Sequence, residues 1–352
     1  MKEFLTTLLY FVEEKGYPLP VAFKKTKEIK KVKGVNYDEL YEISRLLLLS
    51  YNSLKGKRSQ KVKQFLQGDY EILLPSWARE ELSNFLDVKS FERSLKNKVT
   101  WVRINTLKAD VDKVLKSLEN QGVEFEQDND VYYLIKVKDE KKLKTTEEYK
   151  DFKVIIQDKA SVLTVEALEV ENGDKIIDLS SAPGTKASQI MQLGENNVTL
   201  YIADVDINRL EREINFLKRL GVDMNKVHVI HQDSTRNSLL RADKVLLDAP
   251  CSSSGMISNE PAIMVNLTRE KVTYYSKLQE EMIREASKIN ASYMIYSVCS
   301  IFPEEGEDHV IDLRTEKPKI PGERPYKNVN GVRLFPHINL TEGFFITKIL
   351  LQ

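Results

Sequence analysis

The chain has 352 residues, of which 41% are hydrophobic and 30% are charged. This length and composition exclude a single small core and a disordered chain, and they predict two or three globular domains. Lysine plus arginine equals aspartate plus glutamate at 53 each, so the total charge gives no indication of a polyanionic partner.

Two features of the sequence predict an intracellular, cytoplasmic protein. No run of about eighteen apolar residues occurs, and the first residues include Glu3, Glu13 and Glu14 where a cleavable leader would be apolar. The two cysteines, Cys251 and Cys299, are too few for a disulfide scaffold and fit a reducing compartment. We therefore expect neither a membrane segment nor a disulfide.

Residues 1–68 are predicted to form a helical domain. Apolar residues recur with helical spacing in a first run, and Asn36 precedes a second run of this kind. Residues 1–70 hold 14 Lys or Arg against 8 Asp or Glu. The lysine-rich stretch of this segment, which either contacts RNA phosphates or forms a solvated face, contains Lys24, Lys25, Lys27, Lys30, Lys31 and Lys33.

Residues 69–153 mix helical and strand-like patterns, which predicts a small α/β domain. Residues 99–104 and 131–137 are strand-like, and residues 111–120 have helical spacing. The charged residues 138–150 are the expected surface connection to the rest of the chain.

From residue 154 to residue 352, strand-like and helical segments alternate regularly. This alternation predicts a parallel sheet with helices packed on it, a Rossmann-like α/β fold, in which ligands bind at the carboxyl ends of the strands. Residues 331–350 resemble a final pair of strands. The strands of the parallel sheet are expected near residues 175–179, 199–203, 227–230, 244–248 and 293–298.

A turn of small residues, from Leu179 to Lys186, follows the first of these strands. Small residues let the backbone approach a ligand closely, as in a nucleotide-binding loop. The turn lacks the G-x-G-x-x-G spacing of NAD sites and the G-x-x-x-x-G-K-[ST] spacing of ATP sites. A different nucleotide-type cofactor is therefore expected here.

Carboxylates follow the second and third strands. Asp204 ends the second strand and can accept hydrogen bonds from both hydroxyls of a ribose, with Asp206 as the competing candidate. Asp233 follows the third strand, where an adenine amino group would lie. The alternative is that Asp204 and Asp233 are only helix caps.

Each cysteine follows an expected strand, Cys251 the fourth and Cys299 the fifth. If these strands are neighbours, both thiols face one pocket. Methylation of carbon 5 of a pyrimidine suits this arrangement, because that carbon becomes nucleophilic only after a thiolate adds to carbon 6. Asp248 can hold the ring nitrogen and the exocyclic amine, and the second thiol can help to remove the carbon 5 proton.

The cysteines have three alternative roles. Two small, soft side chains can simply fill the top of the sheet as apolar groups. A disulfide does not fit a reducing compartment. A zinc site is not expected, because the two cysteines lack C-x-x-C spacing and the four histidines are scattered along the chain.

The segments DLSSAPGTKAS, DAPCSSSG, YSVCSIFPEE and RLFPHINLTEGFF occur in this order. Together with Asp204 and Asp233, these segments resemble the Sun (RsmB-type) family of RNA cytosine-5 methyltransferases. The resemblance covers about residues 154–352 and continues more weakly upstream in LPSWAREEL, WVRINTL and IIQDKAS. It implies a class I methyltransferase domain that uses S-adenosylmethionine. That domain would be preceded by a small, RRM-like α/β domain and an N-terminal helical domain, both with a possible role in RNA binding.

By this resemblance, Cys299 is the nucleophile and Cys251 assists product release. Asp248 binds the target base, and Lys186 is the partner of that aspartate. Arg209 matches a further family position, and the turn after the first strand holds the methionine part of the cofactor. The residues implied to bind S-adenosylmethionine are Ser180, Ser181, Ala182, Pro183, Gly184, Thr185, Lys186, Asp204, Arg209, Asp233 and Asp248.

The expected substrate is an unpaired cytosine in rRNA or tRNA. A stacked, paired cytosine does not open one face to a thiol and the other to a methyl donor. Residues 258–262 lack the basic pair that often precedes Pro261 in the family, which affects the expected substrate contacts. Two alternatives are a DNA cytosine-5 methyltransferase, which attacks with Cys251 and leaves Cys299 without a role, and an RNA-binding assembly factor with little activity.

Overall fold

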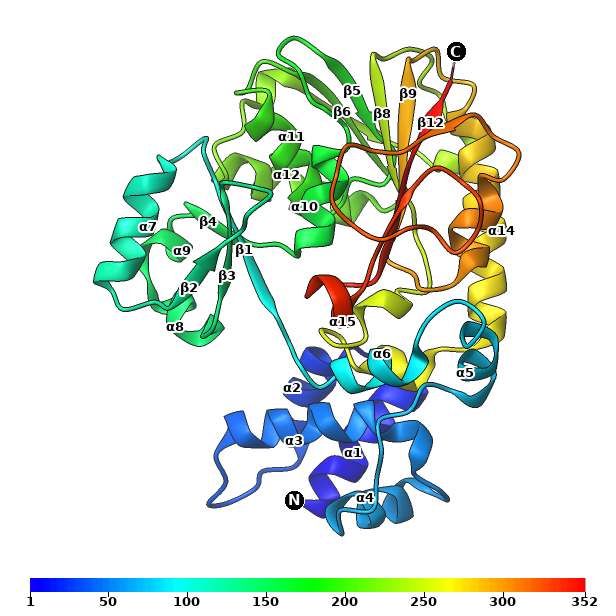
Figure 1. Cartoon of the computed structure of the whole chain (residues 1–352). Helices are drawn as coiled ribbons and strands as arrows, with labels where there is room; N and C mark the ends of the chain where they lie inside the picture. The colour runs from blue at the N-terminus through cyan, green and yellow to red at the C-terminus, as the bar shows by residue number, and fades with distance from the viewer. Residues whose placement is uncertain (352) are drawn as a thin grey trace.

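The largest element of the computed structural model, which describes residues 1–351, is an eight-stranded sheet (Figure 1). Its strands follow the order β10-β12-β9-β8-β5-β6-β7, and β11 pairs with β12. The five strands expected from the sequence are parallel to one another. The predicted Rossmann-like sheet is therefore confirmed. The parallel strands are β5 (Lys175–Asp178), β6 (Thr199–Asp204), β7 (Val227–His231), β8 (Lys244–Asp248) and β9 (Tyr293–Val298).

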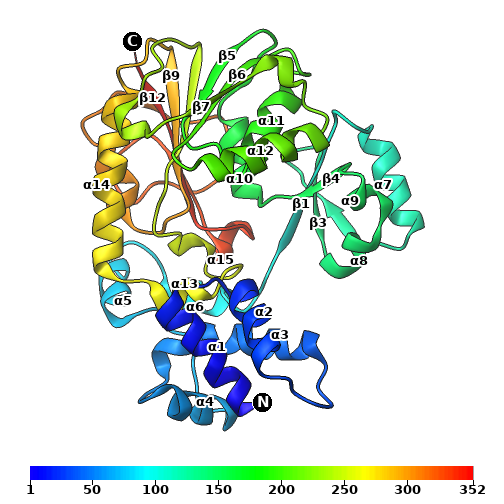
Figure 2. The same ribbon diagram turned by 180° about the vertical axis from the view of Figure 1, so that it is seen from behind.

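Helices cover both faces of this sheet, as Figures 1 and 2 show. Ile176 and Leu246 point into a core shared with α10 and α11, whereas Ile177, Val245 and Leu247 point into a core shared with α14. Successive strand residues thus alternate between two buried cores, as they do in doubly wound sheets. These helices are α10 (Lys159–Glu166), α11 (Thr185–Leu193), α12 (Ile207–Arg219) and α14 (Arg269–Ala286). The short α13 (Ala262–Asn266), which precedes α14, packs on the N-terminal helices instead.

The C-terminal segment completes the sheet with antiparallel strands. β11 (Val332–Leu334) and β12 (Phe344–Leu350) form the strand pair expected from the sequence, and α15 (Pro336–Asn339) connects them. β12 also pairs with β9 along its length, and the short β10 (Thr315–Glu316) pairs with the end of β12. This segment therefore lies beside the strand that ends at Cys299.

Residues 100–156 form a second, antiparallel sheet in the order β2-β3-β1-β4. The sequence of elements is β-α-β-β-α-β, with the second helix in two pieces, and it is the arrangement of ferredoxin-like folds. Its elements are β1 (Thr100–Ile104), α7 (Val111–Asn120), β2 (Phe125–Gln127), β3 (Leu134–Val137), α8 (Glu140–Thr145), α9 (Glu147–Lys150) and β4 (Val154–Ile156).

The domain boundary predicted after residue 153 is wrong, because β4 pairs with β1 in the small sheet. The apolar run that was expected to begin the catalytic domain instead completes the domain before it. The expected helix over residues 111–120 agrees with α7 residue for residue, whereas β2 was not predicted.

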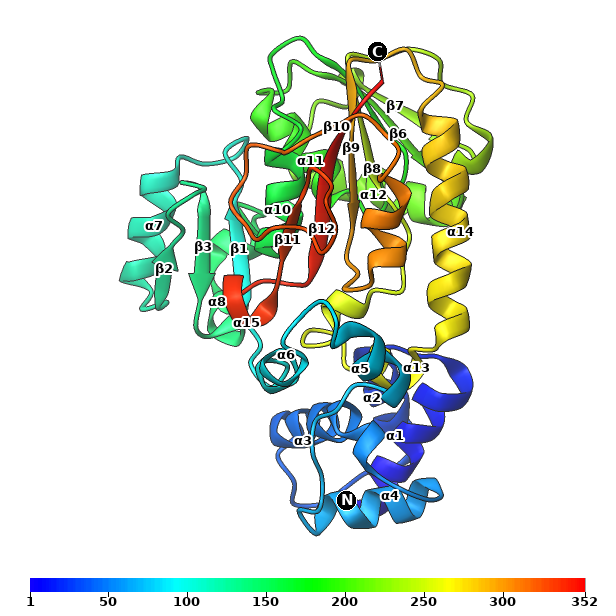
Figure 3. The ribbon, with the colours of Figure 1, turned by 45° about the vertical axis from the view of Figure 1, so that its right-hand side comes forward.

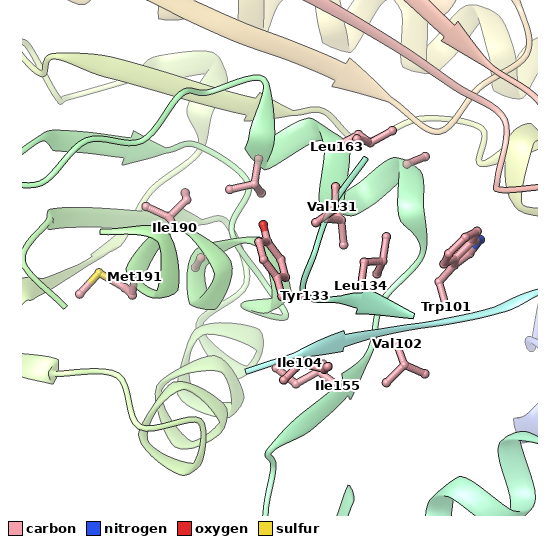
Figure 4. Packing of buried hydrophobic residues seen from close by; sticks show 14 of the residues in the cluster. Trp101, Val102, Ile104, Val131, Tyr133, Leu134, Ile155, Leu163, Ile190 and Met191 are labelled. Atoms are coloured by element: carbon pink, nitrogen blue, oxygen red, sulfur yellow. The ribbon is translucent and has the colours of Figure 1, made fainter. Parts of the chain in front are cut away.

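The small sheet and the large domain share one hydrophobic core. Figure 4 shows Tyr133 and Leu134 of the small sheet close to Leu163 of α10 and Ile190 of α11, all within one cluster of buried side chains. The two domains are therefore packed as one body along this face.

Arg103 of β1 is buried in the same interface and is 0% exposed. Its guanidinium donates to Gln157 Oε1 and to Ser188 Oγ of α11, both at 2.6 Å. Burial lowers the pKa of Arg103 to about 10, which still leaves it charged at neutral pH. This face of the small sheet is covered by protein and does not present an open platform for stacking RNA bases.

The first helices attach to the large domain through α13. Asn36 caps α3 as expected, since its side chain accepts a hydrogen bond from the amide of Asp38. Ala262 of α13 belongs to the core that these helices enclose. Arg45 of α3 is buried and donates to the carbonyl oxygen of Ser258 at 3.0 Å. The helices are α1 (Lys2–Lys15), α2 (Leu19–Ile29), α3 (Tyr37–Leu49), α4 (Arg58–Leu66), α5 (Ser76–Leu82) and α6 (Val88–Ser94).

The helices α5 and α6 pack on the large domain and not on the small sheet. Figure 3 shows α6 beside α15, and residues of the two helices are in contact. Within residues 1–351, none of the helices combines the length and apolar character needed to cross a lipid bilayer.

A buried ion pair joins β11 to the segment that follows β9. Arg333 and Glu307 are both 0% exposed, and Arg333 Nε donates to Glu307 Oε1 at 2.9 Å. We expect Glu307→Gln to lower the free energy of unfolding by about 3–5 kcal/mol, because it leaves a buried guanidinium without its counter-ion. Urea denaturation measures this change. Glu124→Gln, which breaks an exposed pair with Lys138, is the control and should cost about 0–1 kcal/mol. Equal losses for the two variants would contradict the prediction.

Candidate active site

Two cavities lie at the edge of the large sheet where the parallel strands end. The larger has a volume of about 450 Å³ and the smaller about 270 Å³. Four residues line both cavities: Ser180, Ala182, Asp248 and Cys299. A group bound in the larger cavity therefore meets a group bound in the smaller one at these four side chains.

The two thiols lie together, because β8 and β9 are neighbouring strands. Both cysteines are free, and their Sγ atoms are 3.0 Å apart. Cys299 lines both cavities, whereas Cys251 is 7% exposed and lines only the smaller. The hydrogen bond with Cys299 and burial raise the pKa of Cys251 well above its ordinary value. Cys251 therefore holds its proton more firmly than an ordinary thiol does.

Asp248 is held at the junction of the cavities by two hydrogen bonds. Lys186 Nζ donates to its Oδ2 at 2.6 Å, and Ser297 Oγ donates to its Oδ1 at 2.7 Å. Burial by itself lowers the pKa of Lys186, but the charge of Asp248 and the hydrogen bond to it outweigh burial and raise that pKa above its ordinary value. Lys186 is therefore charged. Ser297, two residues before Cys299 on β9, was not predicted as a site residue.

The turn after β5 takes its shape from Gly184, whose φ is 98°. A Cβ atom there would lie 2.8 Å from Cγ of Glu213, so only glycine fits. The same Glu213 accepts a hydrogen bond from Ser181 Oγ at 2.8 Å. Of the turn residues predicted to hold a cofactor, the smaller cavity is lined by Ser180 and Ala182, and the larger by these two with Ser181, Pro183, Thr185 and Lys186.

Asp204, Arg209 and Asp233 line the smaller cavity but not the larger one. Arg209 Nη1 lies 3.2 Å from Asp204 Oδ2, and its guanidinium also donates to the carbonyl oxygen of Ala182. Asp206, the competing candidate, does not line the cavity and caps α12 instead. Asp233 was expected to be either a cofactor ligand or only a helix cap. It caps a short helical turn and also lines the smaller cavity.

A buried carboxylate that was not predicted, that of Glu305, joins the loops after the two cysteines. Its oxygens accept hydrogen bonds from the amide of Ser252 at 2.7 Å, from Ser252 Oγ at 2.5 Å and from Ser300 Oγ. Gln279 Nε2 of α14 lies 3.4 Å from the same carboxylate. Ser252 and Ser300 each follow a cysteine directly, so Glu305 sets the separation of the two thiols.

Four further carboxyl groups that were not predicted line the larger cavity: Glu140, Asp158, Asp178 and Glu342. Asp178 is 1% exposed, and its Oδ2 has no hydrogen-bond partner. Burial and the charge of Asp158 raise the pKa of Glu342 well above its ordinary value, and burial raises that of Asp158. Asp158 and Glu342 therefore hold their protons more firmly than free carboxyl groups do.

Within residues 1–351, no group of three or more His, Cys, Asp or Glu side chains is arranged to hold a metal ion.

The Rossmann-like sheet, its small-residue turn and its strand-end carboxylates define the fold class of the nucleoside-cofactor methyltransferases. A solved structure described as a methyltransferase homolog protein from Pyrococcus horikoshii is 26% identical, with a TM-score of 0.68, over 82% of this chain and 97% of that one.

Residues 165–350 match the family described as 16S rRNA methyltransferase RsmB/F, which is more than half of the chain. The chain belongs to this family, and the resemblance found in the sequence is confirmed.

Curated relatives agree with this assignment. A tRNA (cytosine(49)-C(5))-methyltransferase of Pyrococcus abyssi is 32% identical over 70% of this chain and 86% of the relative. A 26S rRNA (cytosine-C(5))-methyltransferase of Caenorhabditis elegans is 29% identical over 81% of this chain and 46% of the relative. The chain thus spans less than half of the length of the first curated relatives that it matches.

The two thiols should differ in reactivity. The thiolate is the form that reacts with iodoacetamide, and the raised pKa of Cys251 keeps it protonated while Cys299 is more exposed. At pH 8 we expect alkylation of Cys299 at least about tenfold faster than that of Cys251, with Cys251 reacting only well above the ordinary thiol pKa of about 8.5. Peptide mass spectrometry measures both rates. The urea-unfolded chain is the control, and equal rates in the folded chain would contradict the assignment of the protonated thiol.

Proposed function

We propose that this chain is an RNA (cytosine-5) methyltransferase that uses S-adenosylmethionine and attacks its substrate with Cys299. The single observation that carries the proposal is that Cys299 and Asp248 line both cavities. The larger cavity then takes the cytosine and the smaller takes the methyl donor, so the two reactants meet at the nucleophile. The family membership and the names of the relatives favour RNA over DNA as the substrate.

In the first step, the thiolate of Cys299 adds to carbon 6 of the cytosine, and the ring electrons move toward nitrogen 3. Lys186 and Asp248 face the ring from the same wall of the larger cavity. Asp248 accepts a hydrogen bond from the exocyclic amine, and the ammonium of Lys186 offsets the negative charge that develops on the ring. The same step makes carbon 5 nucleophilic.

The smaller cavity fits the methyl donor in its chemistry. Asp204 and Asp233 stand after neighbouring strands, as ribose and adenine ligands do in this architecture, and Arg209 holds Asp204 in place. When bound, S-adenosylmethionine supplies an electrophilic methyl group. Ser180 and Ala182 line both cavities, and they would hold the end of the cofactor that carries this methyl group.

Release of the product needs removal of the proton on carbon 5 and cleavage of the bond between Cys299 and carbon 6. Cys251 lies 3.0 Å from the nucleophile and lines the cavity of the methyl donor, so it is placed to take this proton directly or through water. The thiol of Cys251 first gives its own proton to solvent water through the smaller cavity, and its raised pKa then makes the thiolate a strong base for the carbon 5 proton.

We infer that the RNA approaches across both smaller domains. Trp101 of the small sheet lines the larger cavity. Within residues 1–351, four of the six lysines of the lysine-rich stretch have no ion-pair partner: Lys24, Lys27, Lys31 and Lys33. Lys27 lies over the ring of Tyr37 instead. The other three cations are available for phosphate contacts. The substrate is an unpaired cytosine of rRNA or tRNA, and the two free thiols fit a cytoplasmic location.

Bisulfite sequencing of RNA from cells with the gene and from cells without it tests the proposal. We expect one or a few cytosines to lose their methylation when the gene is deleted. A Cys299→Ser gene should fail to restore it, and purified Cys251→Ser protein should accumulate a covalent complex with the RNA because release slows by about 10²–10⁴-fold. If Cys251→Ser is the inactive variant and Cys299→Ser is the one that accumulates the covalent complex, the attack is made by Cys251, as expected for a DNA cytosine-5 methyltransferase. Cofactor binding without any methylated cytosine would favour an assembly factor.

The role of Glu305 gives a separate prediction. Glu305→Gln keeps the shape of the side chain but replaces one carboxylate oxygen with a donor that the hydroxyls of Ser252 and Ser300 cannot use in the same geometry. We expect single-turnover methylation to slow by about 100-fold, because displacing the thiols by about 1 Å costs that much. The RNA affinity should not change, since Glu305 is 0% exposed. Glu304→Gln, one residue earlier in a surface pair with Arg269, is the matched control. A rate equal to that of the control would contradict the prediction.

A further inference from the structure

A third cavity lies next to the larger one, between α6 and α15, and its volume is about 340 Å³. We call it the α6–α15 cavity. Four residues line both it and the larger cavity: Val99, Asp158, Asn259 and Glu342. The two cavities therefore share a wall, and a chain that places one group in the larger cavity can place its next group here.

The α6–α15 cavity is rich in polar groups without partners. The side chains of Arg93 and Asn97 are exposed and make no hydrogen bond or ion pair within the described residues. His337 is half-buried, and its Nδ1 is buried without a hydrogen-bond partner. Pro336 and Leu340 add apolar surface to the lining. Buried polar atoms usually have partners, so this lining is suited to a ligand with both an apolar face and polar edges.

A nucleobase with its phosphate has this chemistry. The guanidinium of arginine binds phosphate oxygens, and the imidazole and amide groups of His337 and Asn97 can hydrogen-bond to a base edge. Enzymes that extrude a target base commonly contact the nucleotides on either side of it, and these contacts set the preferred sequence context. Because the α6–α15 cavity shares a wall with the larger cavity, it is placed to receive the nucleotide next to the target base.

Resting on the function proposed above, we propose that the α6–α15 cavity binds the nucleotide adjacent to the target cytosine. Arg93 contacts its phosphate, and His337 and Asn97 contact its base. The cavity is built from α6, which precedes the residues that match the family, and from α15 within them. The preference of the enzyme for the RNA sequence around the target cytosine is then set jointly by α6 and by the C-terminal segment that contains α15.

The test uses a short single-stranded RNA that carries the cytosine identified by bisulfite sequencing. In two further RNAs an abasic residue replaces the nucleotide on one side or on the other side of that cytosine. With the wild-type chain, we expect KM to rise about tenfold for one of the two abasic RNAs and to change little for the other. With the Asn97→Ala and His337→Phe variants, we expect KM for the intact RNA to be raised already. Replacing the adjacent nucleotide by an abasic residue should then raise KM by less than about twofold more.

Lys89→Ala is the control, because Lys89 is an exposed cation of α6 that does not line the cavity. It should leave the tenfold ratio of the wild-type chain in place. Arg93→Ala should raise KM for all three RNAs and weaken the salt dependence of binding. If the intact RNA is methylated and the abasic penalty is the same in the variants and in the wild-type chain, this inference is overturned and the proposed function stands. If the intact RNA is not methylated at all, both are overturned.

Discussion

The separation of the two thiols is the constraint on which the site depends, and one buried carboxylate maintains it. Glu305 accepts hydrogen bonds from the residue after Cys251 and from the residue after Cys299. It is fixed in turn by α14, through Gln279, and by Tyr296, whose hydroxyl donates to its carbonyl oxygen at 2.6 Å. A carboxylate without exposure to water must keep these donors, so the loops are held at one distance. In the proposed reaction, one thiol attacks carbon 6 and the other removes the proton from carbon 5, so the two groups must keep a fixed separation.

The C-terminal segment reinforces the same constraint from the other side. The carbonyl oxygen of Cys299 accepts a hydrogen bond from the amide of Gly255 at 3.0 Å, and the carbonyl oxygen of Gly255 accepts one from the amide of Gly343 at 2.9 Å. A Cβ atom on Gly255 would lie 1.9 Å from the carbonyl oxygen of Gly343, so this close approach requires glycine. The guanidinium of Arg333 also donates to the carbonyl oxygen of Ser300. The final strands therefore do more than close the sheet, because they support the loop that holds Cys299, the proposed nucleophile.

Much of the fold followed from the sequence, because buried parallel strands are apolar runs with clear ends. The strand containing Tyr293 and the helix beginning at Val111 begin and end where they were expected. The edge strand beginning at Phe125 was missed because it is three residues long and largely exposed. The run beginning at Val154 was assigned to the wrong domain, since an apolar run does not tell which sheet a strand joins. The predicted site residues were those that stand directly after strands. Asp158 and Glu342 were missed because tertiary contact brings them together across 184 residues, where the amide of Glu342 donates to Asp158 at 3.1 Å.

The position of the small sheet bears on how a shared catalytic domain serves different RNAs. Its first strand is held against α11 by Arg103, so it moves with the turn that follows β5. Beside that arginine, Trp101 lines the larger cavity, and its indole nitrogen donates to the carbonyl oxygen of Leu340 at 2.7 Å. The wall of the larger cavity, the proposed site of the target base, is thus made partly by a domain outside the matched family region. Changes in this wall can alter which nucleotide enters the cavity while the thiols and their supporting carboxylate stay in place, because Glu305 and its partners lie entirely within the large domain.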